Sequence, residues 1–167
     1  LNLLDAVSRL FSTNVISGSI VGIITEYPLW VGITVIGLVP AILEESVYRG
    51  VFFNEYRKQN PRLGIFVSGL LFGLMHMNFN QFVYAFVMGV IFALLVEATD
   101  SLLASMVVHF TINSTSVVAA WVTRGTDITY GQEELLYNIR FLIVPAVVMT
   151  AGAFGLLYLI AGLEGRR

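Results

Sequence analysis

The chain has 167 residues, of which 57% are hydrophobic and only 12% charged, and its mean hydropathy is +0.83. Soluble domains carry roughly 25% charged residues, so this composition is that of an integral membrane protein. A net charge of −2 gives no basic surface for nucleic acid, and the absence of cysteine excludes disulfides, thiolate metal sites and a cysteine nucleophile. We therefore expect residues 1–167 to form a single all-α domain, a polytopic transmembrane helical bundle.

Apolar runs separated by polar breaks predict about six membrane helices. The expected spans, in chain order, are residues 11–25, 29–56, 63–77, 81–96, 102–122 and 138–162. A proline, Pro28, separates the first two spans, because the residue before a proline is disfavoured in a helix. Polar turns or loops separate the others, and they are residues 57–62, 78–80, 97–101 and 124–137.

The basic residues of these loops predict how the bundle is oriented. Alternating the loops between the two sides of the membrane places six basic residues on one side: Arg9, Arg57, Lys58, Arg62, Arg166 and Arg167. Only Arg124 and Arg140 fall on the other side. Because cytoplasmic loops carry the excess of Lys and Arg, we expect the turn 57–62 and the C-terminus to be cytoplasmic.

Two adjacent glutamates and an arginine interrupt the second span: Glu44, Glu45 and Arg49. A charge at the centre of a membrane helix costs roughly 2.5–3.5 kcal/mol on insertion scales, so residues of this kind usually serve a function. On a helix, Glu45 and Arg49 are four residues apart and share one face, whereas Glu44 is turned about 100° away. The spacing predicts that Arg49 holds Glu45 while Glu44 faces another partner.

Three further polar residues lie inside expected spans: His76, His109 and Asn113. Single polar residues in membranes often serve only as hydrogen-bonding contacts between helices. Together with the glutamates, however, these residues could form the site of a hydrolase that activates water. A buried carboxylate can deprotonate water, a neutral histidine can orient that water or bind a divalent metal, and a His/Asn pair can stabilise an oxyanion.

Two alternatives to a glutamate base are a bound zinc ion and a serine nucleophile. The metalloprotease helix His-Glu-x-x-His is absent, so a zinc ion would need ligands from separate helices, such as Glu44, His76 and His109. Ser46 follows the glutamates directly, but no pattern marks it as an activated nucleophile.

Three motifs in this order on successive helices resemble those of the CPBP family, which comprises type II CAAX prenyl endopeptidases and the bacteriocin-processing and self-immunity (Abi) proteins. They are Glu44-Glu45-x-x-x-Arg49, Phe72-x-x-x-His76 and His109-x-x-x-Asn113. The resemblance covers about residues 29–121, which we take as the catalytic core. It implies an intramembrane endopeptidase with a CAAX-protease-like helical fold and a water-filled cavity open to one membrane face.

The resemblance also implies a role for each motif residue. Glu44 would act as the general base that activates water together with His76. The pair His109 and Asn113 would stabilise the oxyanion, and the second glutamate and the arginine would support the first glutamate. Both a zinc-dependent and a metal-free glutamate mechanism are compatible with these residues.

The resulting hypothesis is an intramembrane protease of a prokaryotic plasma membrane that cleaves a membrane-associated peptide or protein, such as a prenylated tail or a leader peptide. Its expected partners are this substrate and the lipid bilayer, with no nucleic acid. One alternative is a non-catalytic self-immunity or scaffold protein of the same fold. Another is a proton-coupled transporter that uses the two glutamates as a relay, although the sequence lacks the repeated half common in transporters.

Overall fold

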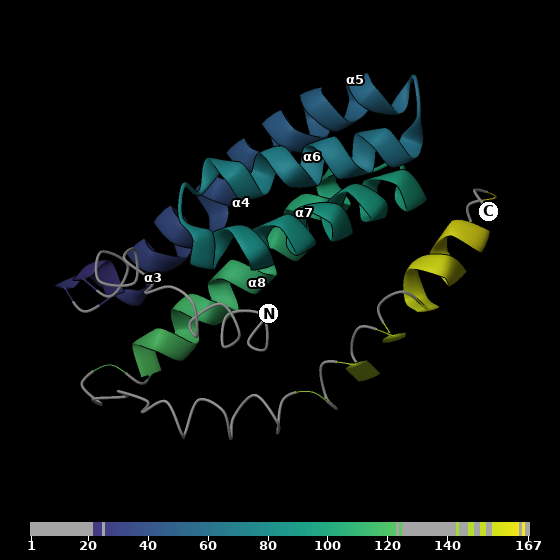
Figure 1. Cartoon of the computed structure of the whole chain (residues 1–167). Helices are drawn as coiled ribbons and strands as arrows, with labels where there is room; N and C mark the ends of the chain where they lie inside the picture. Colours follow the sequence, from purple (N-terminus) through teal and green to yellow (C-terminus); the bar gives the residue numbers. More distant parts are fainter. Residues whose placement is uncertain are drawn as a thin grey trace.

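The computed structural model describes residues 22–24, 26–122 and 124 and, nearer the C-terminus, residues 143, 147–148, 151–152, 155–163 and 165. The described part is helical and contains no strand (Figure 1). Four of the six expected spans lie within it, whereas the expected spans 11–25 and 138–162 extend outside the described residues. The all-α membrane fold predicted from the sequence is confirmed.

One long helix carries the two glutamates and runs without interruption from Leu29 to Arg57. Its winding changes along its length, and its segments are α3 (Leu29–Gly32), η1 (Ile33–Leu38), α4 (Val39–Glu45), η2 (Ser46–Phe53) and α5 (Asn54–Arg57). The segments η1 and η2 are π-helical, with hydrogen bonds that reach five residues back, a winding that is frequent at functional sites. Both π-helical segments directly flank the turn of helix that contains the glutamates.

Three more helices follow: α6 (Pro61–Met75), α7 (Phe79–Thr99) and α8 (Leu102–Val122). Asn60 begins α6, because its side-chain oxygen accepts hydrogen bonds from the N–H groups of Arg62 at 2.9 Å and Leu63 at 3.4 Å. The long helix, α7 and α8 are each long and apolar enough to cross a membrane, whereas α6 is a shorter apolar helix. The expected bounds of these four spans differ from the observed ones by three residues or fewer.

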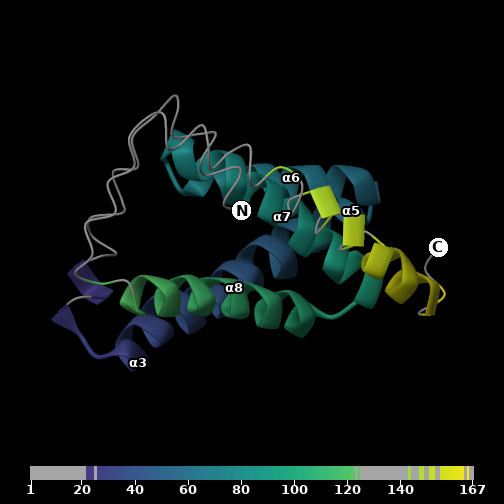
Figure 2. The same ribbon diagram turned by 90° about the horizontal axis from the view of Figure 1, so that it is seen from below.

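The long helix changes its packing partner half-way along. Its first half, α3, η1 and α4, packs on α8, and its second half, η2 and α5, packs on α6 (Figures 1 and 2). α6 and α7 form an antiparallel hairpin with the most extensive contact of the fold. The glutamates of α4 therefore lie where the long helix passes from α8 to the hairpin.

Glycines allow the two helices of the hairpin to approach closely. A Cβ atom on Gly89 would lie 2.8 Å from the Cα atom of Gly69, so the two backbones are in direct contact. A Cβ on Gly73 would lie 3.0 Å from the ring of Phe82 in α7, and one on Gly64 would lie 2.9 Å from the backbone of Arg57 in α5, both closer than van der Waals contact. These glycines therefore permit close packing of α6 on both of its neighbours.

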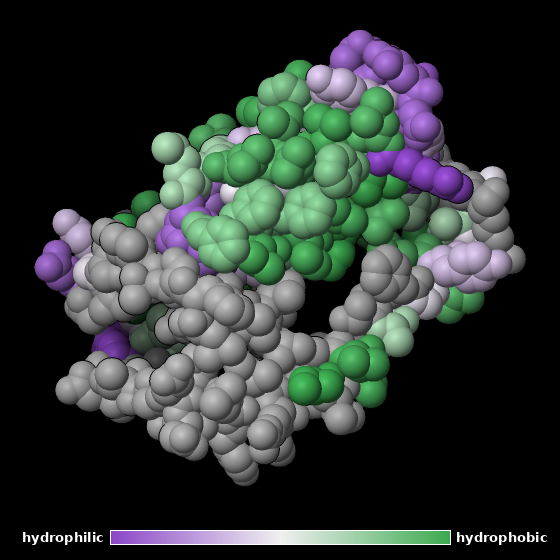
Figure 3. Space-filling view, viewed as in Figure 1, coloured by the Kyte–Doolittle hydropathy of each residue, from purple (hydrophilic) through white to green (hydrophobic). Residues whose placement is uncertain are grey.

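The surface of the bundle fits a lipid environment. The hydrophobic face over the α6–α7 hairpin is continuous, and polar side chains gather at the α5–α6 turn, with a smaller polar group at the other end of the hairpin (Figure 3). With about 1.5 Å of rise per residue, Glu44 lies about 20 Å along its helix from the α5–α6 turn, and His109 is at the same depth because its Nε2 lies 3.9 Å from Oε2 of Glu44. A bilayer core is about 30 Å thick, so a polar end at the membrane surface would put both side chains inside the membrane.

Candidate active site

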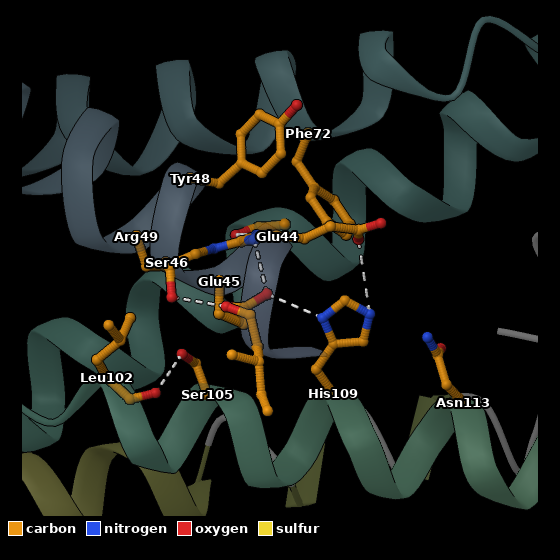
Figure 4. Close-up of polar contacts among 12 residues, drawn as sticks. Glu44, Glu45, Ser46, Tyr48, Arg49, Phe72, Leu102, Ser105, His109 and Asn113 are labelled. Atoms are coloured by element: carbon orange, nitrogen blue, oxygen red, sulfur yellow. Dashed lines mark hydrogen bonds and ion pairs between the residues drawn. The ribbon is translucent and has the colours of Figure 1, made fainter. Parts of the chain in front are cut away.

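The polar residues singled out from the sequence, His76 apart, gather around the middle of the long helix (Figure 4). Glu44 and Glu45 end α4, Arg49 follows one turn later in η2, and His109 and Asn113 face them from α8. Burial separates the two glutamates, since the Glu45 side chain is fully buried whereas that of Glu44 is 22% exposed. Glu44 is therefore the carboxylate that water can reach.

Glu45 is the hub of the hydrogen bonds at this site. Its Oε1 atom accepts a hydrogen bond from Nη1 of Arg49 at 2.8 Å, which confirms the predicted pair four residues apart. The same oxygen lies 3.0 Å from Nδ1 of His109. Its contacts in the structure are with the arginine and with His109.

Arg49 compensates the buried charge and ties the long helix to α7. Its guanidinium is fully buried, and Nη2 donates to the backbone oxygen of Gly89 at 2.9 Å. The group also lies over two aromatic rings, 4.5 Å from the centroid of Phe72 and 5.1 Å from that of Phe92. These contacts replace part of the water that an arginine loses on burial, since its Nε has no hydrogen-bond partner in the described part of the chain.

His109 is held in one orientation. Its ring stacks on Phe92, with centroids 5.0 Å apart, and meets Phe72 edge-on at 5.8 Å. Because an ionised Glu45 can only accept, Nδ1 of His109 is the donor of their hydrogen bond. The other ring nitrogen, Nε2, then faces Glu44, 3.9 Å from its Oε2 atom.

His76 ends α6 and is oriented by its own helix. Its Nδ1 lies 2.9 Å from the backbone oxygen of Phe72, and a carbonyl oxygen can only accept. In the singly protonated ring, Nδ1 is then the donor and Nε2 is an acceptor. Glu44 interacts electrostatically with both His76 and His109, so the structure brings both histidines of the chain to the same carboxylate.

Asn113 lies one helical turn beyond His109 on α8 (Figure 4). Its Nδ2 atom donates to the backbone oxygen of Ile36 in η1 at 3.0 Å. Since a carbonyl only accepts, this contact identifies the atom that faces η1 as the amide nitrogen. The amide has two N–H groups and uses one of them here, which leaves the second for another acceptor.

Ser46 has no arrangement suited to a nucleophile. Its hydroxyl donates to the backbone oxygen of Ile42 at 2.6 Å, which is the usual contact of a serine within a helix (Figure 4). This contact agrees with the sequence analysis, which found no pattern that marks Ser46 as an activated nucleophile.

The proposed metal ligands do not form a ready metal site. Among the described residues, no group of three His, Asp or Glu side chains is arranged so that it could hold a metal ion. Nδ1 of each histidine is engaged, by Glu45 in one case and by the carbonyl of Phe72 in the other, which leaves Nε2 as the nitrogen that could bind a metal. Zinc binding therefore stays a prediction.

Two backbone oxygens and one ring belong to the site and were missed from the sequence: those of Ile36 and Gly89, and the ring of Phe92. A carbonyl leaves no mark on the sequence, and one phenylalanine among twelve is not distinctive. For Ile36 a signal existed, because Pro40 lies four residues later inside a span and cannot supply the N–H that this carbonyl would otherwise accept.

Comparison with known proteins identifies the family. Residues 10–115 match the family model described as type II CAAX prenyl endopeptidase Rce1-like, and this match covers more than half of the chain and all three motifs. No curated protein and no solved structure matched the chain. The protein is an integral membrane protein that belongs to the Rce1-like family of type II CAAX prenyl endopeptidases.

Proposed function

We propose that the protein is an intramembrane endopeptidase in which Glu44 activates the water that attacks a peptide bond. The observation that carries this proposal is the difference between the two adjacent glutamates. Glu45 is fully buried and its charge is compensated by Arg49, whereas Glu44 is partly exposed and faces Nε2 of His109. Only Glu44 combines access to water with histidines at its side.

The proposed reaction proceeds in two steps. Glu44 takes a proton from water while the water oxygen bonds to the peptide carbonyl carbon, and the acceptor nitrogen Nε2 of His76 helps to orient that water. The carbonyl oxygen becomes an oxyanion. The C–N bond then breaks, and Glu44 returns its proton to the leaving amine, which leaves a carboxylic acid and an amine as products.

We propose that His109 and Asn113 stabilise the oxyanion. Asn113 has a second N–H beyond the one given to Ile36. His109 already donates Nδ1–H to Glu45, so it can donate from Nε2 only when the ring carries both protons. The oxyanion role of His109 therefore requires the doubly protonated ring, which has a carboxylate near each of its nitrogens.

No step of this mechanism uses a metal. The zinc that the sequence motifs allow would draw on Glu44, His76 and His109, which as placed form no group that could hold a metal ion. Zinc dependence stays a prediction, and the response of cleavage to a chelator tests it.

We propose that the substrate is membrane-associated, because the candidate base lies about 20 Å along its helix from the polar end of the bundle. A prenylated tail and a leader peptide are the two substrate classes that we would test first. We also propose that the protein lies in a prokaryotic plasma membrane with the turn 57–62 in the cytoplasm, and the excess of basic residues on that side supports this orientation. Since the sequence has no cysteine, a single cysteine at Lys58 and a membrane-impermeant maleimide would test this orientation.

The test of the function uses the purified protein and a panel of quenched peptides that includes a prenylated one. Wild type, Glu44→Ala and His76→Ala are compared, each with and without added zinc and with a chelator. We expect the wild type to cleave at least one peptide, and both variants to remain folded but lose cleavage. Unchanged cleavage by Glu44→Ala would overturn the assignment. A folded wild type that binds peptides and cleaves none would favour the non-catalytic immunity or scaffold protein.

A further inference from the structure

Pro40 lies inside the long helix, four residues before Glu44 and near the start of α4. In an α-helix the N–H of residue 40 would bond to the carbonyl oxygen of Ile36, but proline has no N–H and its ring crowds that carbonyl. The backbone before Pro40 is wound as the π-helix η1, and the N–H of Val39 bonds five residues back to the oxygen of Thr34. The proline thus withholds the α-helical partner of the Ile36 carbonyl.

The side chain of Asn113 bonds to this carbonyl. Its Nδ2 atom donates to the oxygen of Ile36 at 3.0 Å, across the contact between η1 and α8. In a membrane helix a carbonyl released by a proline needs another partner, and a side chain of a neighbouring helix is one that can supply it. Nearby, a Cβ on Gly37 would lie 2.6 Å from Oγ of Ser114, so η1 and α8 are close enough for this bond.

We propose that Pro40 is a positioning residue for the oxyanion site, because it exposes the Ile36 carbonyl that fixes the amide of Asn113. With one N–H held by Ile36, rotation of the amide is restricted and the second N–H points in a defined direction. This inference deepens the proposed function, since the value of an oriented amide rests on the oxyanion role of Asn113. A catalytic donor must be held within a fraction of an ångström of its working position.

The surroundings of Pro40 indicate that it acts through the helix backbone and not by filling space in the core. The residues around it on the outer side of the helix, Val39, Ile42 and Leu43, are exposed hydrophobic side chains. Pro40 is only partly buried, so filling space in the core is not its main contribution. Pro61 offers a matched comparison, since it occupies the first turn of α6, where a missing N–H displaces no helical bond.

The first experiment measures the bond itself and needs no activity. In solubilised protein labelled with ¹⁵N-asparagine, the side-chain amide signal of Asn113 is assigned by its loss in Asn113→Ala. Pro40→Ala supplies an N–H for the carbonyl of Ile36, so we expect the Asn113 amide protons to shift. Pro61→Ala should leave this signal in place. An unchanged Asn113 signal in folded Pro40→Ala would overturn the inference, whether or not the protein cleaves any peptide.

The second experiment is a double-mutant cycle on a peptide that the wild type cleaves. We expect Pro40→Ala to lower kcat by about 10- to 100-fold, as for a misplaced catalytic group, with little change in KM. In the Asn113→Ala background the same change should alter kcat by no more than about twofold, because a residue that acts through Asn113 has nothing left to position. An equal loss in both backgrounds would show that Pro40 acts on the fold in general and would refute the proposal.

Discussion

Replacement of Arg49 by leucine should unfold the protein far more readily than any surface change. The arginine is fully buried and is the charged partner of the fully buried Glu45. Removal of one member of a buried ion pair leaves an uncompensated charge and typically costs about 3–5 kcal/mol. The control is Lys58→Leu, whose ion pair with Glu55 is two-thirds exposed and should be worth less than about 1 kcal/mol.

The double variant Glu45→Leu/Arg49→Leu separates the charge from the packing. An apolar pair of similar volume removes both charges, so the remaining cost is chiefly the unpaired Nδ1 of His109, about 1–3 kcal/mol. We therefore expect the double variant to be more stable than Arg49→Leu alone, although it should be a poor enzyme because His109 has lost its support.

The free energies of unfolding of all four proteins can be measured by titration with a denaturing detergent in mixed micelles, followed by the fluorescence of Trp30 and Trp121. Trp30 lies in α3 and Trp121 near the end of α8, so the two tryptophans report on the part of the bundle where these helices pack together. A double variant no more stable than Arg49→Leu, or a cost of under about 1 kcal/mol for Arg49→Leu, would refute the view of Arg49 as the partner of a buried charge.

Two further predictions concern the helix hairpin. Gly89→Ala should destabilise the protein by about 1–3 kcal/mol and slow cleavage, because the added Cβ would lie 2.8 Å from the Cα of Gly69 and 3.1 Å from Nη2 of Arg49. The control in thermal unfolding is Gly50→Ala, whose nearest new contact is 3.6 Å. Equal melting temperatures for the two variants would contradict this prediction. Met77→Gly should stabilise the protein by about 1 kcal/mol in the same assay, since Met77 is exposed and has a φ of 49°, which favours glycine. A lower melting temperature for this variant would argue against backbone strain at Met77.

Much of the fold was predictable because each helix carries its own signals. Long apolar runs predicted the four described spans, and Pro28 and the polar turn 57–62 predicted two of the breaks. The Glu45–Arg49 pair was also predictable, since the spacing of residues on one helix fixes which side chains share a face. The change to π-helical winding on both sides of α4 was not predictable from hydrophobic pattern, which does not distinguish the two windings.

The partners of the site residues could be predicted only in part. Sequence indicated that Glu44, His76 and His109 would meet, because polar groups buried in a membrane need one another. It did not indicate that Glu45 would bond to His109, since that contact depends on how far α8 is shifted along the long helix. The Arg49–Gly89 bond depends in turn on the close approach of α6 and α7, which follows from the pairing of specific glycines in space.

The measurement that tests the central claim most directly is the turnover of Glu44→Gln on a peptide that the wild type cleaves. Glutamine keeps the size of the side chain but cannot accept a proton from water. We predict a loss in kcat of about 10²- to 10⁴-fold, the usual worth of a general base, while Glu55→Gln, which alters an exposed carboxylate paired with Lys58, should turn over like the wild type. A Glu44→Gln protein with kcat close to that of the wild type would contradict the assignment of Glu44 as the base.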